Sequence, residues 1–164
     1  MKKGEMNKGN GMKRAVSLGL SLVIAAGLLL AGCGSKKAMN VDEVSGRLLK
    51  EITYQDELNA MSLEQAAMFL NLSDISVKSG AIYETSGWTA EEIVVLECET
   101  AADADKAKAM LETRVAEQIT NYTDYVPEEL DKLHAAVIVE SGNFAVLSVS
   151  NDPDQARSIL SEYQ

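Results

Sequence analysis

The sequence predicts a mixed α+β fold: a two-layer sandwich with helices on one face of about four antiparallel strands. Two observations support it. Apolar runs of strand length occur as two pairs, each joined by a short turn rich in Ser and Gly. Each pair is followed by apolar residues at helical spacing. Because consecutive hairpins reverse the chain direction, the sheet must be antiparallel.

Two helices are expected before the first hairpin. Asn40 and Glu43 have the spacing of a capping box, and apolar residues follow at helical intervals from Val41 to Ile52. A second capping box, Ser62 with Gln65, begins a short helix. A polar loop over 55–60 is expected to join the two.

The first hairpin is expected from strands at 81–85 and 92–99, with Ser86 and Gly87 in the turn. Thr100 then caps a long helix. The apolar stripe of this helix consists of Ala104, Ala107, Leu111, Val115, Ile119 and Tyr122.

The second unit begins with a short helix from Pro127 through Leu133. Strands at 135–139 and 144–149 follow, with a tight turn around Gly142. Asp152 and Pro153 start the last helix, which carries Ala156, Ile159, Leu160 and Tyr163 on its apolar side.

The segment 105–111 is similar to the segment 154–160, and each follows an apolar strand. The similarity has two interpretations. Either the domain contains two copies of a hairpin-then-helix unit, or any strand followed by an amphipathic helix produces such a match.

The N-terminus has the pattern of an export signal. Its first 14 residues carry five basic side chains and one acid, a net charge of +4 (5 minus 1), and residues 15–31 are uncharged and mostly apolar. This run is shorter than the roughly 20 residues of a membrane-spanning helix. Leu30, Ala31, Gly32 and Cys33 resemble the lipobox of bacterial lipoproteins, in which the bond before the cysteine is cut and its thiol is lipidated. A buried cysteine after a plain signal peptide or signal anchor is the alternative.

The lipobox implies three parts: a signal peptide over 1–32, a lipidated tether over 33–40 and a single α+β domain over 41–164. Two acyl chains on Cys33 would hold the protein stably at the outer face of the cell membrane, since one chain anchors only reversibly. The membrane is therefore one expected partner.

Charge and cysteine content restrict the function further. After Gly32 the chain keeps 10 basic residues (15 minus 5) and 24 acidic ones (25 minus 1), a net charge of −14, which argues against nucleic acid as a partner. With Cys33 lipidated, only Cys98 remains, so no intrachain disulfide is possible. Cys98 lies in an apolar run and is expected to be a core side chain.

No catalytic residue, metal site or cofactor is predicted. Phosphate-binding loops, HExxH pairs and GxSxG elbows are absent from the sequence. The only histidine, His134, is expected at the surface where a helix meets a strand. Most of the paired acids, which are Glu91 with Glu92, Asp103 with Asp105, Glu128 with Glu129 and Asp152 with Asp154, are explained by the favourable charge of helix starts.

Trp88, Tyr122 and Tyr125 are the candidate contact residues. Trp88 lies at the expected hairpin turn, where an exposed indole would be a contact point. Packing of Trp88 back over the sheet is the alternative.

The body also resembles a family of small lipoproteins from low-GC Gram-positive bacteria that is classed as a domain of unknown function. The resemblance rests on the order of elements, on Asn121, Tyr122 and the stretch 125–129, and on the hairpin turning at Gly142. It implies an exported, lipid-anchored domain and supplies no active-site residue. We therefore expect a non-enzymatic module that binds a protein or small ligand; the alternatives are a carboxylate-dependent cell-envelope hydrolase and a subunit of a membrane-associated assembly.

The lipobox assignment predicts that a Cys33→Ala variant is found in the soluble fraction, because it lacks the thiol that accepts the lipid. Membrane fractionation and intact mass are the measurements. Native protein is expected in the membrane fraction with the mass of diacylglycerol on Cys33. Equal release of both forms without lipid would contradict the assignment.

Overall fold

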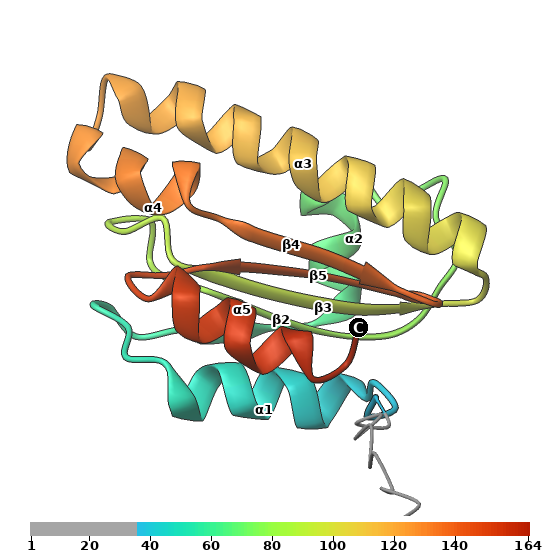
Figure 1. The fold of residues 1–164 in the computed structure, drawn as a ribbon. Coiled ribbons are helices and arrows are strands. Elements are labelled where there is room, and N and C mark those ends of the chain that lie inside the picture. The colour runs from blue at the N-terminus through green and yellow to red at the C-terminus, as the bar shows by residue number, and fades with distance from the viewer. Residues whose placement is uncertain (1–35) are drawn as a thin grey trace, which may run out of the picture. The chain divides into compact units, whose positions relative to one another are not determined.

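The computed structural model describes residues 36–164, which form one five-stranded sheet with five α-helices (Figure 1). The bond between Gly32 and Cys33, and the predicted signal peptide, lie outside these residues. The strands are β1 (Asn59–Met61), β2 (Val77–Glu84), β3 (Glu92–Cys98), β4 (Val137–Ser141) and β5 (Phe144–Val149). The helices are α1 (Val41–Glu51), α2 (Leu63–Phe69), α3 (Ala101–Thr123), α4 (Leu130–His134) and α5 (Pro153–Ser161), with a 3₁₀ turn, η1 (Pro127–Glu129), before α4.

The mixed α+β class, the two N-terminal helices and the two hairpins are confirmed. The start of α1 is capped by the Asn40 side chain, which accepts a hydrogen bond from the Glu43 amide at 3.1 Å. Ser62 and Gln65 form the reciprocal capping box at the start of α2. Each of these helices therefore begins where its polar cap satisfies free backbone amides.

The sheet has five strands where about four were expected. Its order is β1-β2-β3-β5-β4, and all neighbouring pairs are antiparallel. The additional strand, β1, includes the end of the segment predicted as a polar loop. Strand β1 is only three residues long, lies at the sheet edge and is held by backbone pairing with β2. Such a short edge strand needs no alternation of apolar and polar residues, so its sequence carried no strand signal.

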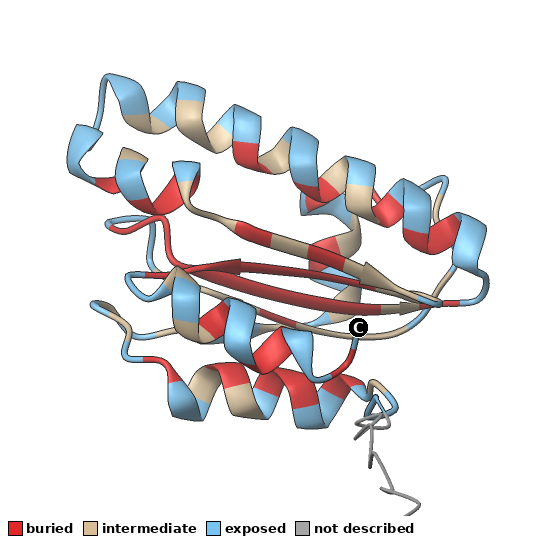
Figure 2. Ribbon diagram, viewed as in Figure 1, coloured by how far each residue is buried: buried red, intermediate tan, exposed pale blue. Residues whose placement is uncertain are grey.

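The predicted two-layer arrangement is wrong, because helices cover both faces of the sheet (Figures 1 and 2). Buried residues of α2, α3 and α4 pack on one face, and those of α1 and α5 pack on the other. The physical reason lies in β3, where the four consecutive residues from Ile93 to Leu96 are all fully buried. Side chains alternate between the two faces of a strand, so such a run requires cover on both.

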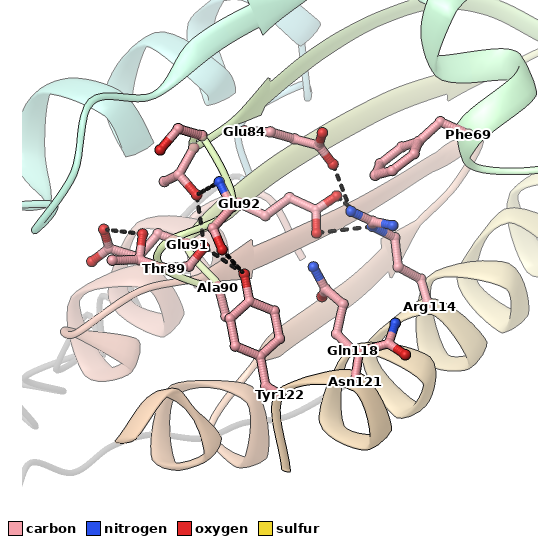
Figure 3. Close-up of a pocket in the computed structure, with 13 residues that line it drawn as sticks. Phe69, Glu84, Thr89, Ala90, Glu91, Glu92, Arg114, Gln118, Asn121 and Tyr122 are labelled. Atoms are coloured by element: carbon pink, nitrogen blue, oxygen red, sulfur yellow. Dashed lines mark hydrogen bonds and ion pairs between the residues drawn. The ribbon is translucent and has the colours of Figure 1, made fainter. Parts of the chain in front are cut away.

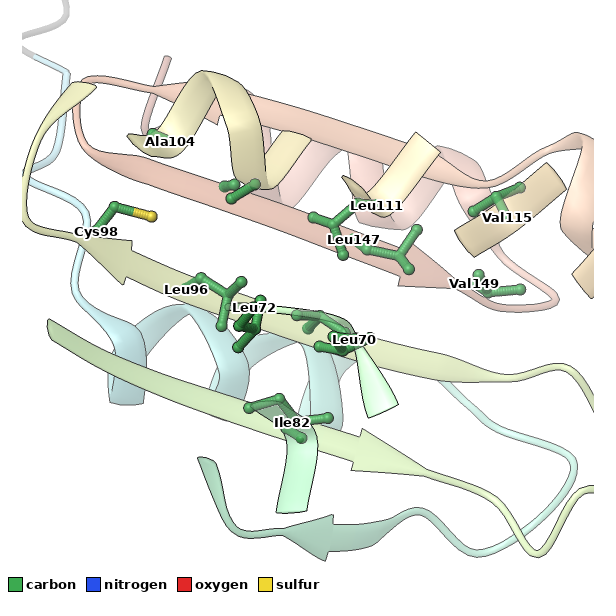
Figure 4. Packing of buried hydrophobic residues seen from close by; sticks show 14 of the residues in the cluster. Leu70, Leu72, Ile82, Leu96, Cys98, Ala104, Leu111, Val115, Leu147 and Val149 are labelled. Carbon is green, nitrogen blue, oxygen red and sulfur yellow. The ribbon is translucent and has the colours of Figure 1, made fainter. Parts of the chain in front are cut away.

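The apolar stripe of α3 packs against the centre of the sheet (Figure 4). Ala104, Ala107, Leu111 and Val115 are buried there beside Leu147 of β5. Cys98 belongs to the same cluster, and burial raises the pKa of its thiol to about 11. The expectation of a core cysteine is thus confirmed, and its thiolate is scarce at neutral pH.

The two hairpin-then-helix units are not equivalent in three dimensions. The aligned strands β3 and β5 direct corresponding residues, such as Leu96 and Leu147, to the same face. The helices that follow them diverge, because α3 covers that face and α5 covers the opposite one. The similarity of segments 105–111 and 154–160 therefore reflects a shared helical pattern rather than a repeated packing arrangement.

The chain enters the domain at one end of the sheet. The Lys37 amide donates to the Glu162 carbonyl at 3.0 Å, and the Ser141 hydroxyl binds the Tyr163 carbonyl at the same end. Asn143 pairs there with Cys98, the last residue of β3. Glu92, at the start of β3, lies about 20 Å away, given the length of a seven-residue strand. Within residues 36–164, no helix combines the length and the apolar character that crossing a membrane requires.

Helices on both faces predict that cavities in either half of the core are costly. Leu48 of α1 and Leu111 of α3 are both fully buried, so Leu48→Ala and Leu111→Ala should each lower the unfolding free energy by about 2–5 kcal/mol. Met68 is 87% exposed, so Met68→Ala should change it by less than about 0.5 kcal/mol. Urea denaturation measures all three, and a Leu48→Ala result as small as the Met68→Ala result would contradict a packed second face.

Candidate functional site

A cavity of about 330 Å³ lies at the end of the sheet where β2 leads into β3 (Figure 3). Its walls come from the C-terminal end of α2, the loop between β2 and β3, and the second half of α3. The lining residues are Phe69, Glu84, Thr85, Ser86, Gly87, Thr89, Ala90, Glu91, Glu92, Arg114, Gln118, Asn121 and Tyr122.

Two carboxylates and one guanidinium meet in the cavity. Glu84 of β2 and Glu92 of β3 are direct partners in the antiparallel register, so their side chains lie on the same face. Arg114 projects from α3 between them: its Nε donates to the two Glu92 oxygens at 2.7 and 2.9 Å, and its Nη2 donates to Oε1 of Glu84 at 2.5 Å. One cation is therefore shared by two acids.

Arg114 is held on a third side by Phe69. The guanidinium carbon lies 3.9 Å from the centre of the Phe69 ring, which is a cation–π contact. Arg114 lies one turn after Leu111, at the edge of the apolar stripe through which α3 packs on the sheet. The fold therefore places the guanidinium over the sheet with little freedom to turn.

Burial dominates the electrostatics of the two acids. Burial and the neighbouring charge of Glu92 raise the pKa of Glu84, Arg114 opposes both, and the net result is a pKa of about 7. Burial also raises the pKa of Glu92, and the charge and hydrogen bonds of Arg114 oppose that increase. Glu84 is the more accessible acid, because its side chain is 18% exposed and that of Glu92 only 1%.

A second buried network fixes the wall of the cavity behind Glu91. The Glu91 carboxylate accepts hydrogen bonds from the backbone amides of Gln55 and Asp56 and from Asn151, all at about 3.0 Å. Lys132 of α4 lies 3.5 Å from Glu91 and 2.8 Å from Glu129. Four segments distant in sequence are thus joined by one group of buried charges.

Glu129 connects this network to the loop between β2 and β3. Its carboxylate accepts a hydrogen bond from the Ala90 amide at 2.8 Å and is itself buried. Because Ala90 lies between Thr89 and Glu91, the last part of the loop is held from the side of α4. The cavity therefore has a rigid wall on this side.

The three predicted contact residues come together at this end of the sheet. The Tyr122 hydroxyl lies 2.8 Å from the Thr89 carbonyl and 3.2 Å from the Gly87 carbonyl, so Tyr122 binds the hairpin loop from α3. Trp88 and Tyr125 form an aromatic pair with ring centres 6.5 Å apart, and they are 69% and 64% exposed. Trp88 thus stands out into solvent, and the alternative of packing over the sheet does not hold.

Other predictions for charged residues are partly corrected. Glu91 and Glu92 do not lie at a helix start, because Glu91 immediately precedes β3 and Glu92 is its first residue. Both are buried, Glu91 beside Lys132 and Glu92 beside Arg114. Asp103 and Asp152 do lie at helix starts, near the caps of α3 and α5. His134 is exposed at the end of α4, as expected, and does not line the cavity.

Sequence reasoning did not identify Glu84 or Arg114 as site residues. The sequence offered two signals. Arg114 is a charged residue at the border of an apolar helical stripe, and the expected strand before this helix begins with acidic residues. Gln118, one turn further along α3, also lines the cavity, and its buried amide oxygen has no hydrogen-bond partner within residues 36–164. No group of three or more potential metal ligands occurs in this part of the chain.

A protein-family model matches the chain over more than half of its length. The family model with the description "Domain of unknown function (DUF4358)" matches residues 50–150. This range contains every residue that lines the cavity. No curated protein and no solved structure gives a significant match to the chain.

The Lys132 network predicts a large loss of stability when its cation is removed. Lys132→Met should lower the unfolding free energy by about 3–5 kcal/mol, because Glu91 and Glu129 would remain buried without their shared countercharge. Lys106→Met is the matched control: it breaks the Lys106–Asp103 pair, in which the lysine side chain is 56% exposed, and should cost less than about 1 kcal/mol. Equal effects of the two changes would show that Lys132 does not compensate the buried acids.

The raised pKa of Glu84 predicts a stability difference that depends on pH. A carboxyl group that titrates near 7 in the folded chain and near 4.5 in the unfolded chain loses its stabilising contribution as pH rises between those values. Glu84→Gln should therefore raise the unfolding free energy at pH 8 by on the order of 1–2 kcal/mol, with little change at pH 5. Denaturation at both pH values is the measurement, with the exposed Glu64→Gln as the control for loss of one charge. The same difference at both pH values would contradict the shift.

Proposed function

The chain belongs to the DUF4358 family. We propose that it is a lipid-anchored, extracytoplasmic, non-enzymatic module that binds a ligand or partner. The resemblance of residues 30–33 to a lipobox supports anchoring through Cys33 at the outer face of a Gram-positive cell membrane. The net charge of −14 expected after cleavage (10 minus 24) supports a domain that is repelled by anionic headgroups.

The position of the cavity relative to the tether supports a binding end that faces outward. The four residue-to-residue steps from Cys33 to Lys37 span at most about 14 Å. Lys37 contacts the domain at the end where β3 finishes, whereas Glu92 and the cavity lie where β3 begins. A tether through Lys37 would therefore join the domain at the end of the sheet opposite the cavity.

The observation that carries the proposal is the cavity together with its aromatic rim. Ligand sites combine a concave surface with a few positioned polar groups, and here Glu84, Arg114 and Gln118 meet inside 330 Å³. Gly87 and Tyr122 belong to the cavity wall and are close in sequence to the exposed pair, Trp88 and Tyr125. A ligand in the cavity would therefore lie near two aromatic rings that are free for contact.

The same geometry favours binding over hydrolysis by carboxylates. A glycosidase-type reaction needs two acids that both reach the substrate. Glu84 and Glu92 do converge from different strands, but Glu92 is sealed beneath Arg114, which holds both of its oxygens. Only Glu84 remains to face a bound molecule, so one half of the required pair is missing.

A subunit of a membrane-associated assembly is the second candidate function. It is favoured by the exposure of Trp88 and Tyr125 as neighbours, since adjacent exposed aromatics are common at protein interfaces. In that case the rim would be the contact surface and the cavity would receive a side chain of the partner.

Blocking the cavity should abolish binding. Asn121 is an exposed cavity residue on α3, so Asn121→Trp should fill the opening without disturbing the core. Native mass spectrometry of the full chain, incubated with small molecules extracted from bacterial envelopes, is expected to show a 1:1 adduct that Asn121→Trp loses.

Ala116→Trp is the matched control, because Ala116 is exposed on the same helix and lines no part of the cavity. This variant should keep the adduct. An adduct that persists in both variants would place binding elsewhere, and an adduct whose mass changes with time would indicate an enzyme. No adduct for the native chain would overturn small-ligand binding and leave the assembly subunit as the candidate.

A further inference from the structure

We propose that the cavity binds its ligand through a protonated amino group that pairs with Glu84. This inference rests on the proposed binding function and adds the chemical class of the ligand. It is built on the charge balance of the cavity, on the fixed position of Arg114 and on the acceptors that remain free.

The charge balance of the cavity is negative. Glu84, Glu92 and Glu91 are its acids, and Arg114 is its only base among the described residues that line it. Glu91 accepts hydrogen bonds from the backbone amides of Gln55 and Asp56 and shares Lys132 with Glu129, so its oxygens are already occupied. This leaves two carboxylates for one guanidinium, so the fully ionised site carries one excess negative charge. A group with one positive charge is its natural complement.

Arg114 is poorly suited to an anionic ligand, because two carboxylates already share its single positive charge. Its Nε is used by Glu92, its Nη2 by Glu84, and one face of the guanidinium lies on Phe69. A carboxylate or phosphate bound to the remaining N–H groups of Arg114 would place a third negative charge beside Glu84 and Glu92. A cation can bind to Glu84 without disturbing this arrangement.

The free polar atoms in the cavity are suited to a donor. Arg114 holds Oε1 of Glu84, so the carboxylate still has acceptor capacity. The amide oxygen of Gln118 also lacks a donor within residues 36–164, but it is buried and would have to turn outward to reach a ligand. An ammonium group offers three donors in a compact volume, and Tyr122 supplies an aromatic wall beside it.

The proton on Glu84 provides a second signature. Charged groups face Glu84 from two elements, Glu92 from β3 and Arg114 from α3, and Tyr122 adds a hydroxyl of raised pKa. With a pKa of about 7, Glu84 is partly protonated at neutral pH. A bound ammonium favours the ionised carboxylate, so binding releases a proton to solvent.

The test compares matched probes on the full chain by isothermal titration. N-acetyl-lysine methylamide and D-glucosamine carry the amine, and N-acetyl-norleucine methylamide and D-glucose are the corresponding neutral probes. At least one amine is expected to bind about tenfold or more tightly than its neutral counterpart. That preference should vanish in Glu84→Gln and persist in Ala116→Trp. Titration at pH 7 in two buffers of different ionisation enthalpy should report proton release.

The outcomes separate this proposal from the general binding function. A preference for the lysine derivative identifies a peptide amine as the source, and one for glucosamine an amino sugar. Equal binding of an amine and its neutral counterpart, unaffected by Glu84→Gln but lost in Asn121→Trp, would overturn the ammonium proposal while supporting a binding cavity. No binding of either amine at about 10 mM would overturn the ammonium proposal. The envelope-extract experiment then decides whether the cavity binds anything.

Discussion

The burial of β3 on both faces is the constraint from which the site follows. Its apolar centre is covered by α3 on one side and by α1 and α5 on the other, and the acids Glu91 and Glu92 lie at its start. A buried carboxylate must be paired or hydrogen-bonded, or it becomes neutral. Glu91 is satisfied by Lys132 and backbone amides. Glu92 is satisfied by Arg114, so each acid recruits a cation from a different helix.

These two pairings have different consequences because the number of additional hydrogen-bond donors differs. Around Glu91, several donors hold three segments in place: the loop after α1, helix α4, and the loop that precedes α5. Glu92 instead shares the Arg114 guanidinium with Glu84, its partner residue on the neighbouring strand β2. The first network is a closed structural connection. In the second, Glu84 keeps free acceptor capacity beside a cavity, which is the arrangement expected where a protein leaves room for a ligand.

Local sequence patterns predicted the elements well and their assembly less well. Capping residues and helical spacing located α1, α2, α3 and α5, because these signals depend on neighbours along the chain. The layering was missed although the uninterrupted apolar run 93–96 is typical of a strand covered on both faces. The pairing of Arg114 with Glu84 depends on sheet register and on the placement of α3, which no local pattern encodes. Trp88 and Tyr125 were chosen individually, and only the fold brings them together.

The attachment of Tyr122 to the hairpin loop has a consequence for recognition. Gly87 adopts a positive φ of 96°, a conformation that residues with a Cβ rarely take, and the Tyr122 hydroxyl reaches the carbonyls on both sides of Trp88. The indole is therefore carried on a short backbone segment whose shape is set before any encounter. A preorganised loop loses little conformational entropy on association, so a larger share of the contact energy made by Trp88 is retained as affinity.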